Sequence, residues 1–144
     1  MTAGPLMIFG SCHASGLLGF VPRLVQAAYV SPFKGSEVAT LILLFAGHAL
    51  CDYPLQGQFL SDAKNRHKNV GEHWMRALFA HSMIHCAMVY LVTGSAILGL
   101  AELIVHAATD HAKCEGRITS TQDQAIHYLC KILWAVLAVY GGVR

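Results

Sequence analysis

The sequence predicts an all-α protein, an integral membrane four-helix bundle with an additional short N-terminal apolar helix. Hydrophobic residues make up 55% of the 144 residues and charged residues only 12%, whereas an ordinary soluble domain carries about 25% charged residues. The apolar residues form long segments between short polar ones, without the alternating runs that are typical of strands. We therefore expect the lipid bilayer as a partner. No cluster of Lys and Arg among aromatic residues indicates nucleic acid.

The chain is expected to have two parts, an N-terminal apolar helix with its linker at 1–36 and a metal-binding bundle at 37–144. The apolar segment 6–21, which Pro22 ends, is short for a membrane span of about 20 residues. It could span the membrane, re-enter it or lie at its surface, and these alternatives stay open.

The second part is expected to hold four longer helices, at residues 37–56, 77–92, 96–113 and 123–140. Pro54 stops the first helix, because proline disrupts the hydrogen bonding of a helix interior. The Gly in the turn at 93–95 ends the second helix, and Gly141 follows the fourth. The hydrophilic segments 57–76 and 114–122 are interpreted as loops.

Each of these four helices carries two candidate metal ligands that stand four residues apart, which puts both side chains on one helix face. Thirteen of the 144 residues are His or Asp, so chance predicts about one such pair. Imidazole and carboxylate groups suit zinc, with manganese or iron as alternatives, and eight ligands are enough for two divalent ions. The pairs are His48/Asp52, His81/His85, His106/Asp110 and Asp123/His127.

The charge distribution predicts that all four pairs lie at one depth of the membrane. Six of the ten Lys and Arg residues fall in the segments 57–76 and 113–122, and basic loops face the cytoplasm. With four spans, these two segments lie on the same side. The ligand pairs stand at the helix ends that adjoin them, and we therefore expect a single site near the cytoplasmic leaflet.

Several stretches of the sequence together resemble a known family. They are HALCDYPLQGQFLSDAKNR from residue 48, the H-x-x-x-H of the second helix, HAATDHAK from residue 106 and DQAIHYL from residue 123. These motifs are similar to those of the family catalogued as domain of unknown function 3307, small membrane proteins of bacteria and their phages. The resemblance covers about residues 41–140 and implies an inner-membrane location in a bacterium or phage-infected cell. It implies roles for the eight paired residues and for Gln56, Lys113 and Gln124. The family is distantly similar to inner-membrane proteins described as metal-dependent hydrolases.

Residues near the pairs are expected to support the ligands. Gln56 and Gln124 are interpreted as groups that orient ligands rather than as ligands, and Lys113 is placed beside them. Glu102 and Lys131 each lie four residues from a ligand pair, at equal depth in neighbouring helices. Their opposite charges predict a buried ion pair. Two alternatives stay open: Glu102 as a ninth ligand, and Lys131 as the group that neutralises an anionic substrate.

These features together predict a membrane-embedded, metal-dependent hydrolase with a binuclear site. Two ions would lower the pKa of a bridging water molecule and polarise the scissile bond. Either Asp52 or Asp110 could bridge the ions. The depth of the site indicates a lipid, lipid-linked or phosphorylated substrate.

Other readings of the same residues stay open. The polar pairs could form a hydrogen-bonded network without metal. A metal-stabilised membrane protein could serve instead as an interaction or assembly subunit, with a second copy of the chain or another membrane protein as partner. A di-iron redox site and ion transport are weaker alternatives, because the chain lacks E-x-x-H spacing and its ligands cluster at one end. Three aromatic residues are placed at the membrane interfaces, namely Trp74, Trp134 and Tyr140.

Overall fold

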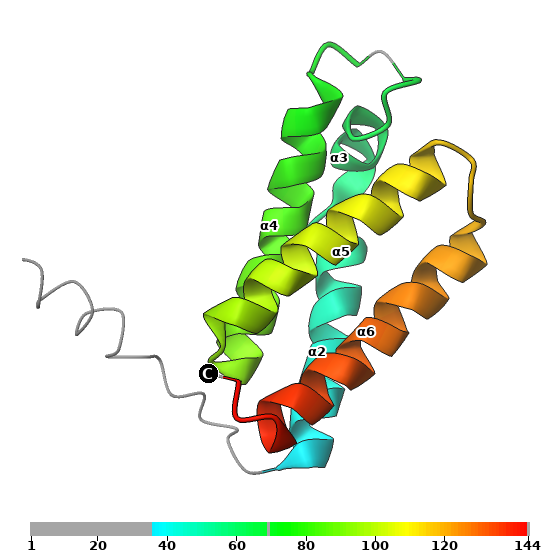
Figure 1. Ribbon diagram of the computed structural model, residues 1–144. Coiled ribbons are helices and arrows are strands. Elements are labelled where there is room, and N and C mark those ends of the chain that lie inside the picture. Colours follow the sequence, from blue (N-terminus) through cyan, green and yellow to red (C-terminus); the bar gives the residue numbers. More distant parts are fainter. Residues whose placement is uncertain (1–35, 69, 144) are drawn as a thin grey trace, which may run out of the picture.

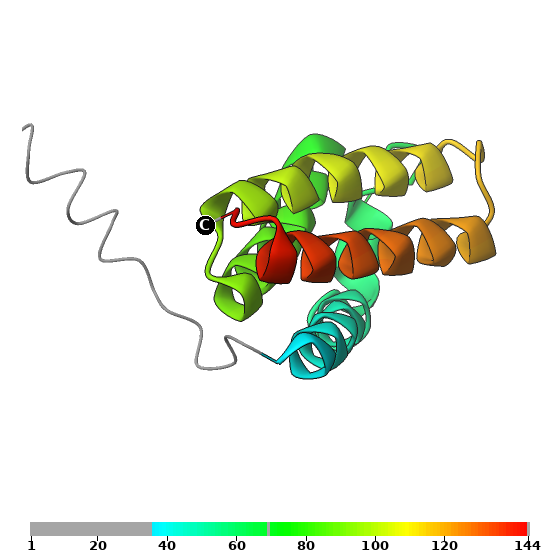
Figure 2. The same ribbon diagram turned by 60° about the horizontal axis from the view of Figure 1, so that its bottom comes forward.

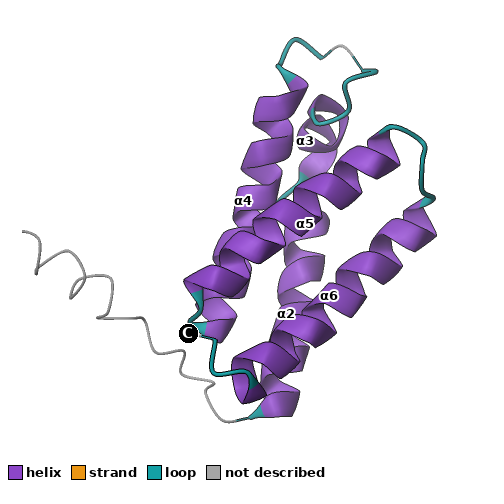
Figure 3. Cartoon of the chain, in the orientation of Figure 1, coloured by secondary structure: helices purple, strands orange, loops and turns teal. Residues whose placement is uncertain are grey.

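The computed structural model describes residues 36–68 and 70–143, and this part of the chain contains five helices and no strand (Figure 3). The all-α prediction is confirmed for these residues. The apolar helix expected at 6–21 lies outside them, and the division of the chain at residue 36 stays a prediction. The helices are α2 (Glu37–Asp52), α3 (Gly57–Ala63), α4 (Trp74–Thr93), α5 (Ala96–Cys114) and α6 (Ser120–Tyr140).

Local capping groups explain where three of the four long helices begin and where α4 ends. The Ser36 hydroxyl accepts a hydrogen bond from the backbone at the start of α2, and Ser95 does the same for α5. Thr119 and Gln122 form a reciprocal capping box at the start of α6. Gly94 ends α4 with a φ of 73°, a left-handed conformation that glycine adopts without steric cost.

The interpretation of residues 57–76 as a loop was wrong in part, because residues Gly57–Ala63 form the short helix α3. This helix is bent by 81° from α2, and the bend follows Pro54. A helix of seven residues is too short to show a clear hydrophobic period in a sequence, and α3 is stabilised by packing against α4. Two further helices begin earlier than expected, α4 at Trp74 and α6 at Ser120.

The four long helices form an antiparallel bundle. Helix α2 packs against α4 and α6, and α5 packs against the same two helices on the other side (Figures 1 and 2). Helix α3, the described residues 64–68 and 70–73 of the following connection, and the connection 115–119 lie at one end of the bundle, toward the top of Figure 1. The α4–α5 turn, the start of α2 and the end of α6 lie at the other end, which we call the turn end.

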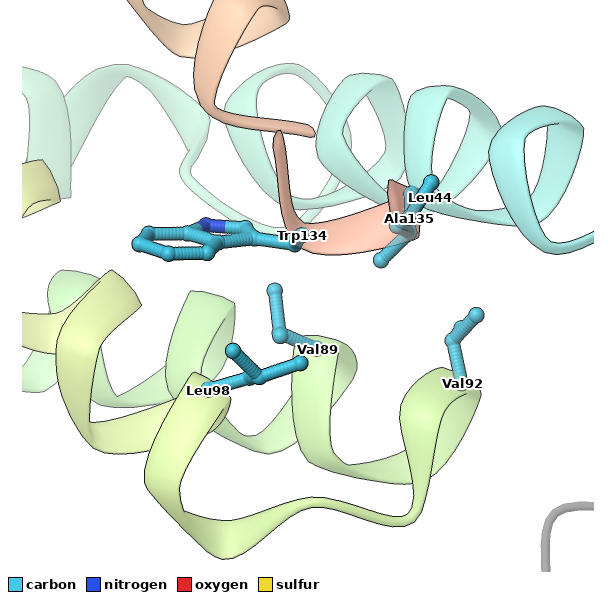
Figure 4. Close-up of a cluster of buried hydrophobic side chains, with 6 residues drawn as sticks. All are labelled: Leu44, Val89, Val92, Leu98, Trp134 and Ala135. Atoms are coloured by element: carbon cyan, nitrogen blue, oxygen red, sulfur yellow. The ribbon is translucent and has the colours of Figure 1, made fainter. Parts of the chain in front are cut away.

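An apolar core fills the half of the bundle nearer the turn end. Six buried side chains from the four long helices form it (Figure 4). Gly99 lets α5 approach α4 closely here, since a Cβ atom at this position would lie 3.0 Å from the carbonyl oxygen of Cys86. The core residues are Leu44, Val89, Val92, Leu98, Trp134 and Ala135.

Apolar side chains also cover the outside of the bundle. Large hydrophobic residues are exposed on every long helix, for example Ile42 at 61%, Phe79 at 58%, Ile104 at 69% and Leu129 at 65%. Among the described helices, however, only α4 is by itself long and apolar enough to cross a membrane, and α2 with α3 qualifies only as a bent pair. Four membrane spans, as expected from the sequence, are therefore not supported by helix length and hydropathy.

Candidate metal centre

The structure brings the eight paired residues together in one buried layer, which we call the ligand layer. It lies between the apolar core and the end of the bundle that carries α3. Seven of them are at most 1% exposed, and the side chain of Asp52 is 7% exposed. Each long helix contributes the two residues of its pair, because a spacing of four keeps both on the inward face. The eight candidate ligands are therefore buried at one level of the bundle.

A first group of possible ligand atoms surrounds one oxygen of Asp52. Its Oδ1 atom lies 3.1 Å from His85 Nε2, 3.3 Å from His81 Nε2 and 3.9 Å from His106 Nε2. The Nε2 atoms of His81 and His106 are 3.1 Å apart. Four ligands around a tetrahedral zinc ion, each bound at about 2.0–2.1 Å, would lie about 3.3–3.4 Å from one another. These atoms thus have nearly the spacing that one ion requires.

A second group consists of Asp110, Asp123 and His127, with one ligand atom from each within 4.8 Å of the others. Asp123 Oδ1 and His127 Nε2 are 3.3 Å apart. Both atoms are buried and have no hydrogen-bond partner among the described residues, and the same holds for His127 Nδ1. Buried polar atoms are nearly always hydrogen-bonded. Their arrangement therefore fits an ion better than a closed network of hydrogen bonds.

Asp110 lies between the two groups. Its Oδ2 atom is 3.4 Å from His81 Nε2 and 3.7 Å from His106 Nε2, both in the first group. Its carboxylate also belongs to the second group. Of the two aspartates that could bridge a pair of ions, the geometry favours Asp110 over Asp52.

His48 stands beside these groups and belongs to neither of them. Its Nε2 atom is 3.4 Å from Asp52 Oδ2 and 3.3 Å from Gln124 Oε1. Gln124 in turn donates from Nε2 to Asp52 Oδ2 at 2.8 Å. Gln124 thus holds one oxygen of Asp52, which leaves the other oxygen facing the histidines of the first group. Gln124 therefore contacts a candidate ligand, and its orienting role stays a prediction.

Lys64 is a site residue that sequence reasoning missed. Its side chain is only 3% exposed, and its Nζ atom donates to Asp110 Oδ2 and, at 2.6 Å, to Gln56 Oε1. Gln56 therefore acts on the site through this lysine. Lys64 lies inside the motif that carries the family resemblance, but its place in a hydrophilic segment suggested a solvated loop. The bend before α3 is what turns the lysine inward.

Lys113 reaches the second group from α5. Its Nζ atom donates to Asp123 Oδ2 at 2.7 Å and lies 3.4 Å from Asp110 Oδ1. The side chain is 29% exposed, which makes it more accessible than the aspartates that it contacts. Lys113 accordingly lies beside the ligands, as expected, at the border between the site and solvent.

Contacts with α5 fasten the segment that carries Lys64. Arg66 forms an ion pair with Glu115, and His67 Nε2 lies 3.2 Å from the other oxygen of the same carboxylate. Desolvation alone would raise the pKa of Glu115, but Arg66 and His67 outweigh it and lower the pKa below its usual range. Glu115 is therefore anionic at neutral pH and can hold the segment in place.

A buried ion pair separates the ligand layer from the apolar core. Lys131 Nζ donates to Glu102 Oε1 at 2.6 Å, and both side chains are buried. Trp134 Nε1 donates to the other oxygen at 2.6 Å, and His106 Nδ1 lies 3.3 Å from Oε1. The placement of Trp134 at a membrane interface was wrong, because its ring is 7% exposed and packs in the core. Glu102 thus contacts His106, and with His106 and His127 it forms a third group that could hold a metal ion, so the alternative of Glu102 as a ninth ligand stays open.

The remaining histidines of the described chain lie outside the ligand layer. His111 follows Asp110 directly, but its ring stacks on Trp74 with the centroids 5.3 Å apart. His73 precedes α4 and is exposed. Neither residue lies in a group that could hold a metal ion.

The comparison with protein families agrees with the motifs. The chain belongs to the family described as protein of unknown function (DUF3307), whose model matches residues 40–141. This match includes all eight paired residues and the lysines beside them. It does not show the distant link to metal-dependent hydrolases. A search of curated proteins and a search of solved structures found no match.

Proposed function

We propose that this protein is an integral membrane, metal-dependent hydrolase with a binuclear His/Asp site at the cytoplasmic leaflet. The observation that carries the proposal is the convergence of four ligand pairs in one buried layer, with Asp110 between two groups of ligand size. The substrate would be a lipid, a lipid-linked molecule or a phosphorylated molecule. Zinc is the ion that fits the ligand spacing and the mixed imidazole and carboxylate donors best.

Two divalent ions in these groups would activate water and polarise the bond to be hydrolysed. The chain's own residues would prepare the site for this chemistry. Gln124 would orient Asp52 through the hydrogen bond that it donates, and Glu102 would position the ring of His106, whose Nδ1 atom lies 3.3 Å away. Because these partners are themselves buried or fixed by further contacts, the ligands are positioned before an ion binds.

The exterior of the bundle supports the membrane part of the proposal. The charged residues of α5 and α6 are buried or, for Lys113, half-buried, whereas the outward faces of both helices carry exposed apolar side chains such as Ile104 and Leu129. Inward charges lower the mean hydropathy of a helix without placing charge against lipid. Phe59 of α3 is 64% exposed, and α3 runs across the end of α2 as a helix at a membrane surface would.

Metal content and hydrolysis together test the proposal. The purified protein should contain two zinc ions per chain, and His81→Ala should lose at least one of them, because His81 contacts both Asp52 and Asp110. Hydrolysis of a panel of phosphate and carboxylate esters should require metal and disappear in this variant. Elemental analysis and a spectrophotometric ester assay are the measurements.

His111→Ala is the matched control, since this histidine lies on the same helix as Asp110 but outside the ligand groups. The control should keep both ions and full activity. A protein that contains no metal when purified, and takes up none when zinc is added, would rule out the proposal.

One observation favours a second candidate function, a metal-stabilised interaction or assembly subunit. The ligand layer is nearly inaccessible, with only Asp52 of the eight residues above 1% exposure. A structural metal site is closed in this way, whereas a catalytic site keeps an open position. Full zinc occupancy without hydrolysis of any ester in the panel would favour this function.

The orientation in the membrane gives a separate prediction. Single cysteines at Lys68 and Glu37, in a chain whose native cysteines are replaced, should be labelled from opposite sides of the membrane. Lys68 belongs to the basic connection before α4, and Glu37 begins α2 at the turn end. A membrane-impermeant thiol reagent, applied to intact cells and to inverted vesicles, should reach Lys68→Cys only in the vesicles. Labelling of both positions from the same side would contradict the predicted topology.

A further inference from the structure

Two lysine ammonium groups contact one carboxylate on the side of the ligand layer that faces α3 and the connections. Lys64 Nζ donates to Oδ2 of Asp110, and Lys113 Nζ lies 3.4 Å from Oδ1 of the same side chain. Lys113 also donates to Asp123 at 2.7 Å. Asp110 and Asp123 are the two carboxylates of the second ligand group. Lysines and metal ions would therefore compete for the same two aspartates.

Metal binding would change the charge of the whole layer. Four carboxylates and three ammonium groups surround the ligand atoms, which gives one net negative charge without metal. Two dications would turn this into three net positive charges. A carboxylate that binds a dication also attracts a neighbouring ammonium group less strongly. The charged residues are Asp52, Lys64, Glu102, Asp110, Lys113, Asp123 and Lys131.

We propose that Lys64 and Lys113 bind the doubly charged phosphate group of a phosphomonoester, next to Asp110 and Asp123. A buried excess of positive charge requires an anion, and a phosphomonoester carries about two negative charges near neutral pH. Phosphodiesters and carboxylates carry one charge and would balance the layer less well. This inference rests on the proposed metal site, because without the ions both lysines stay paired with aspartates.

The exposures of the two lysines fit different places in such a site. Lys113, at 29%, stands where an anion would enter, whereas Lys64, at 3%, forms the inner wall. Lys131, the alternative anion-binding residue, donates to Glu102 on the core side of the layer. The structure therefore points to Lys64 and Lys113 instead.

Binding of inorganic phosphate, the expected product, tests this proposal on the zinc-loaded full chain in lipid nanodiscs. Calorimetry at pH 8 should show phosphate binding at least about tenfold more tightly than dimethyl phosphate, a singly charged diester. Lys113→Gln and Lys64→Met should each weaken phosphate binding by about tenfold or more, as loss of a charged hydrogen bond does. Lys113→Arg should retain most of the affinity, and Lys68→Gln, which removes an exposed lysine paired with Asp62, should change nothing.

The source of the phosphate group is tested in a second arm, with phosphatidic acid added to the nanodiscs. Competition with inorganic phosphate would identify a lipid phosphomonoester, and lack of competition a water-soluble one; both results keep the site. Zinc content is measured on the same samples, so that loss of metal, which contradicts the proposed function, is distinguished from loss of phosphate binding. The proposal would be overturned if the zinc-loaded protein bound no phosphate. It would also be overturned if the Lys113→Gln and Lys113→Arg variants bound phosphate equally well.

Discussion

Zinc added to the metal-free protein is expected to stabilise it by about 4 kcal/mol for each ion bound, at a free concentration a thousand times the dissociation constant. The physical reason is that the metal-free layer is costly. It holds buried carboxylates together with imidazole nitrogens that have no hydrogen-bond partner among the described residues, including those of His127. In the folded state only, an ion would bind Asp123 Oδ1 and one ring nitrogen of His127. Unfolding by denaturant in detergent micelles, followed by circular dichroism, measures the gain.

Two variants test whether the stabilisation by zinc arises from the ligand layer. His85→Ala removes a candidate ligand that lies 3.1 Å from Asp52, and the zinc-dependent gain should fall by roughly half, since one of the two proposed ion sites would be lost. His111→Ala should keep the full gain, because this ring stacks on Trp74 outside the ligand layer. An equal gain in His85→Ala and in the unaltered protein would mean that zinc binds elsewhere.

The ligand layer was predictable because helix geometry converts a spacing in sequence into a position in space. Residues four apart share a helix face whatever surrounds the helix, so the pair His81/His85 needed only a helix around it. The common level of the four pairs followed from the two basic segments 57–76 and 113–122, which place the adjoining helix ends on one side of the bundle. The Glu102–Lys131 contact followed from the same reasoning one turn deeper.

Features that depend on how the chain turns between two helices were not predictable from residue spacing. Lys64 is buried because the chain bends by 81° between α2 and α3, and no local pattern gives the direction of a bend. Trp134 was misplaced because its amphipathic ring suits an interface as well as a buried polar partner. Only the three-dimensional structure shows that Glu102 supplies that partner.

The rotation of each helix about its own axis decides which aspartate lies between the two groups, and the sequence does not give this rotation. Asp52 and Asp110 occupy equivalent places in their pairs, so the sequence offered no reason to choose the bridging ligand. The choice in favour of Asp110 depends on distances of 3.4 and 3.7 Å to histidines on two helices. The mean hydropathy of α5 and α6 was similarly ambiguous as a sign of membrane spans, because both helices bury polar residues inside the bundle and expose apolar ones on the outside.

Breaking the Glu102–Lys131 pair from one side should destabilise the protein by about 3–5 kcal/mol, because the remaining charge would be buried without its partner. Lys131→Met leaves the carboxylate with Trp134 Nε1 as donor and His106 Nδ1 nearby. Glu102→Gln leaves the ammonium group without its carboxylate, and we expect the larger loss there. The double variant, which buries no charge at this level, should recover most of the stability. Unfolding in detergent micelles measures all three.

Zinc content separates the pair's structural role from an effect on the metal site. Lys131→Met should keep both ions, because the ion pair of Lys131 is with Glu102 and not with any of the eight paired residues. Glu102→Gln should weaken zinc binding by about 10–100-fold, since it alters the carboxylate that orients His106. A double variant as unstable as the sum of the single ones would show that the two charges are not coupled. In that case the 2.6 Å contact between the two charges would not stabilise the fold, and Glu102 would act on the protein through its contacts with Trp134 and His106.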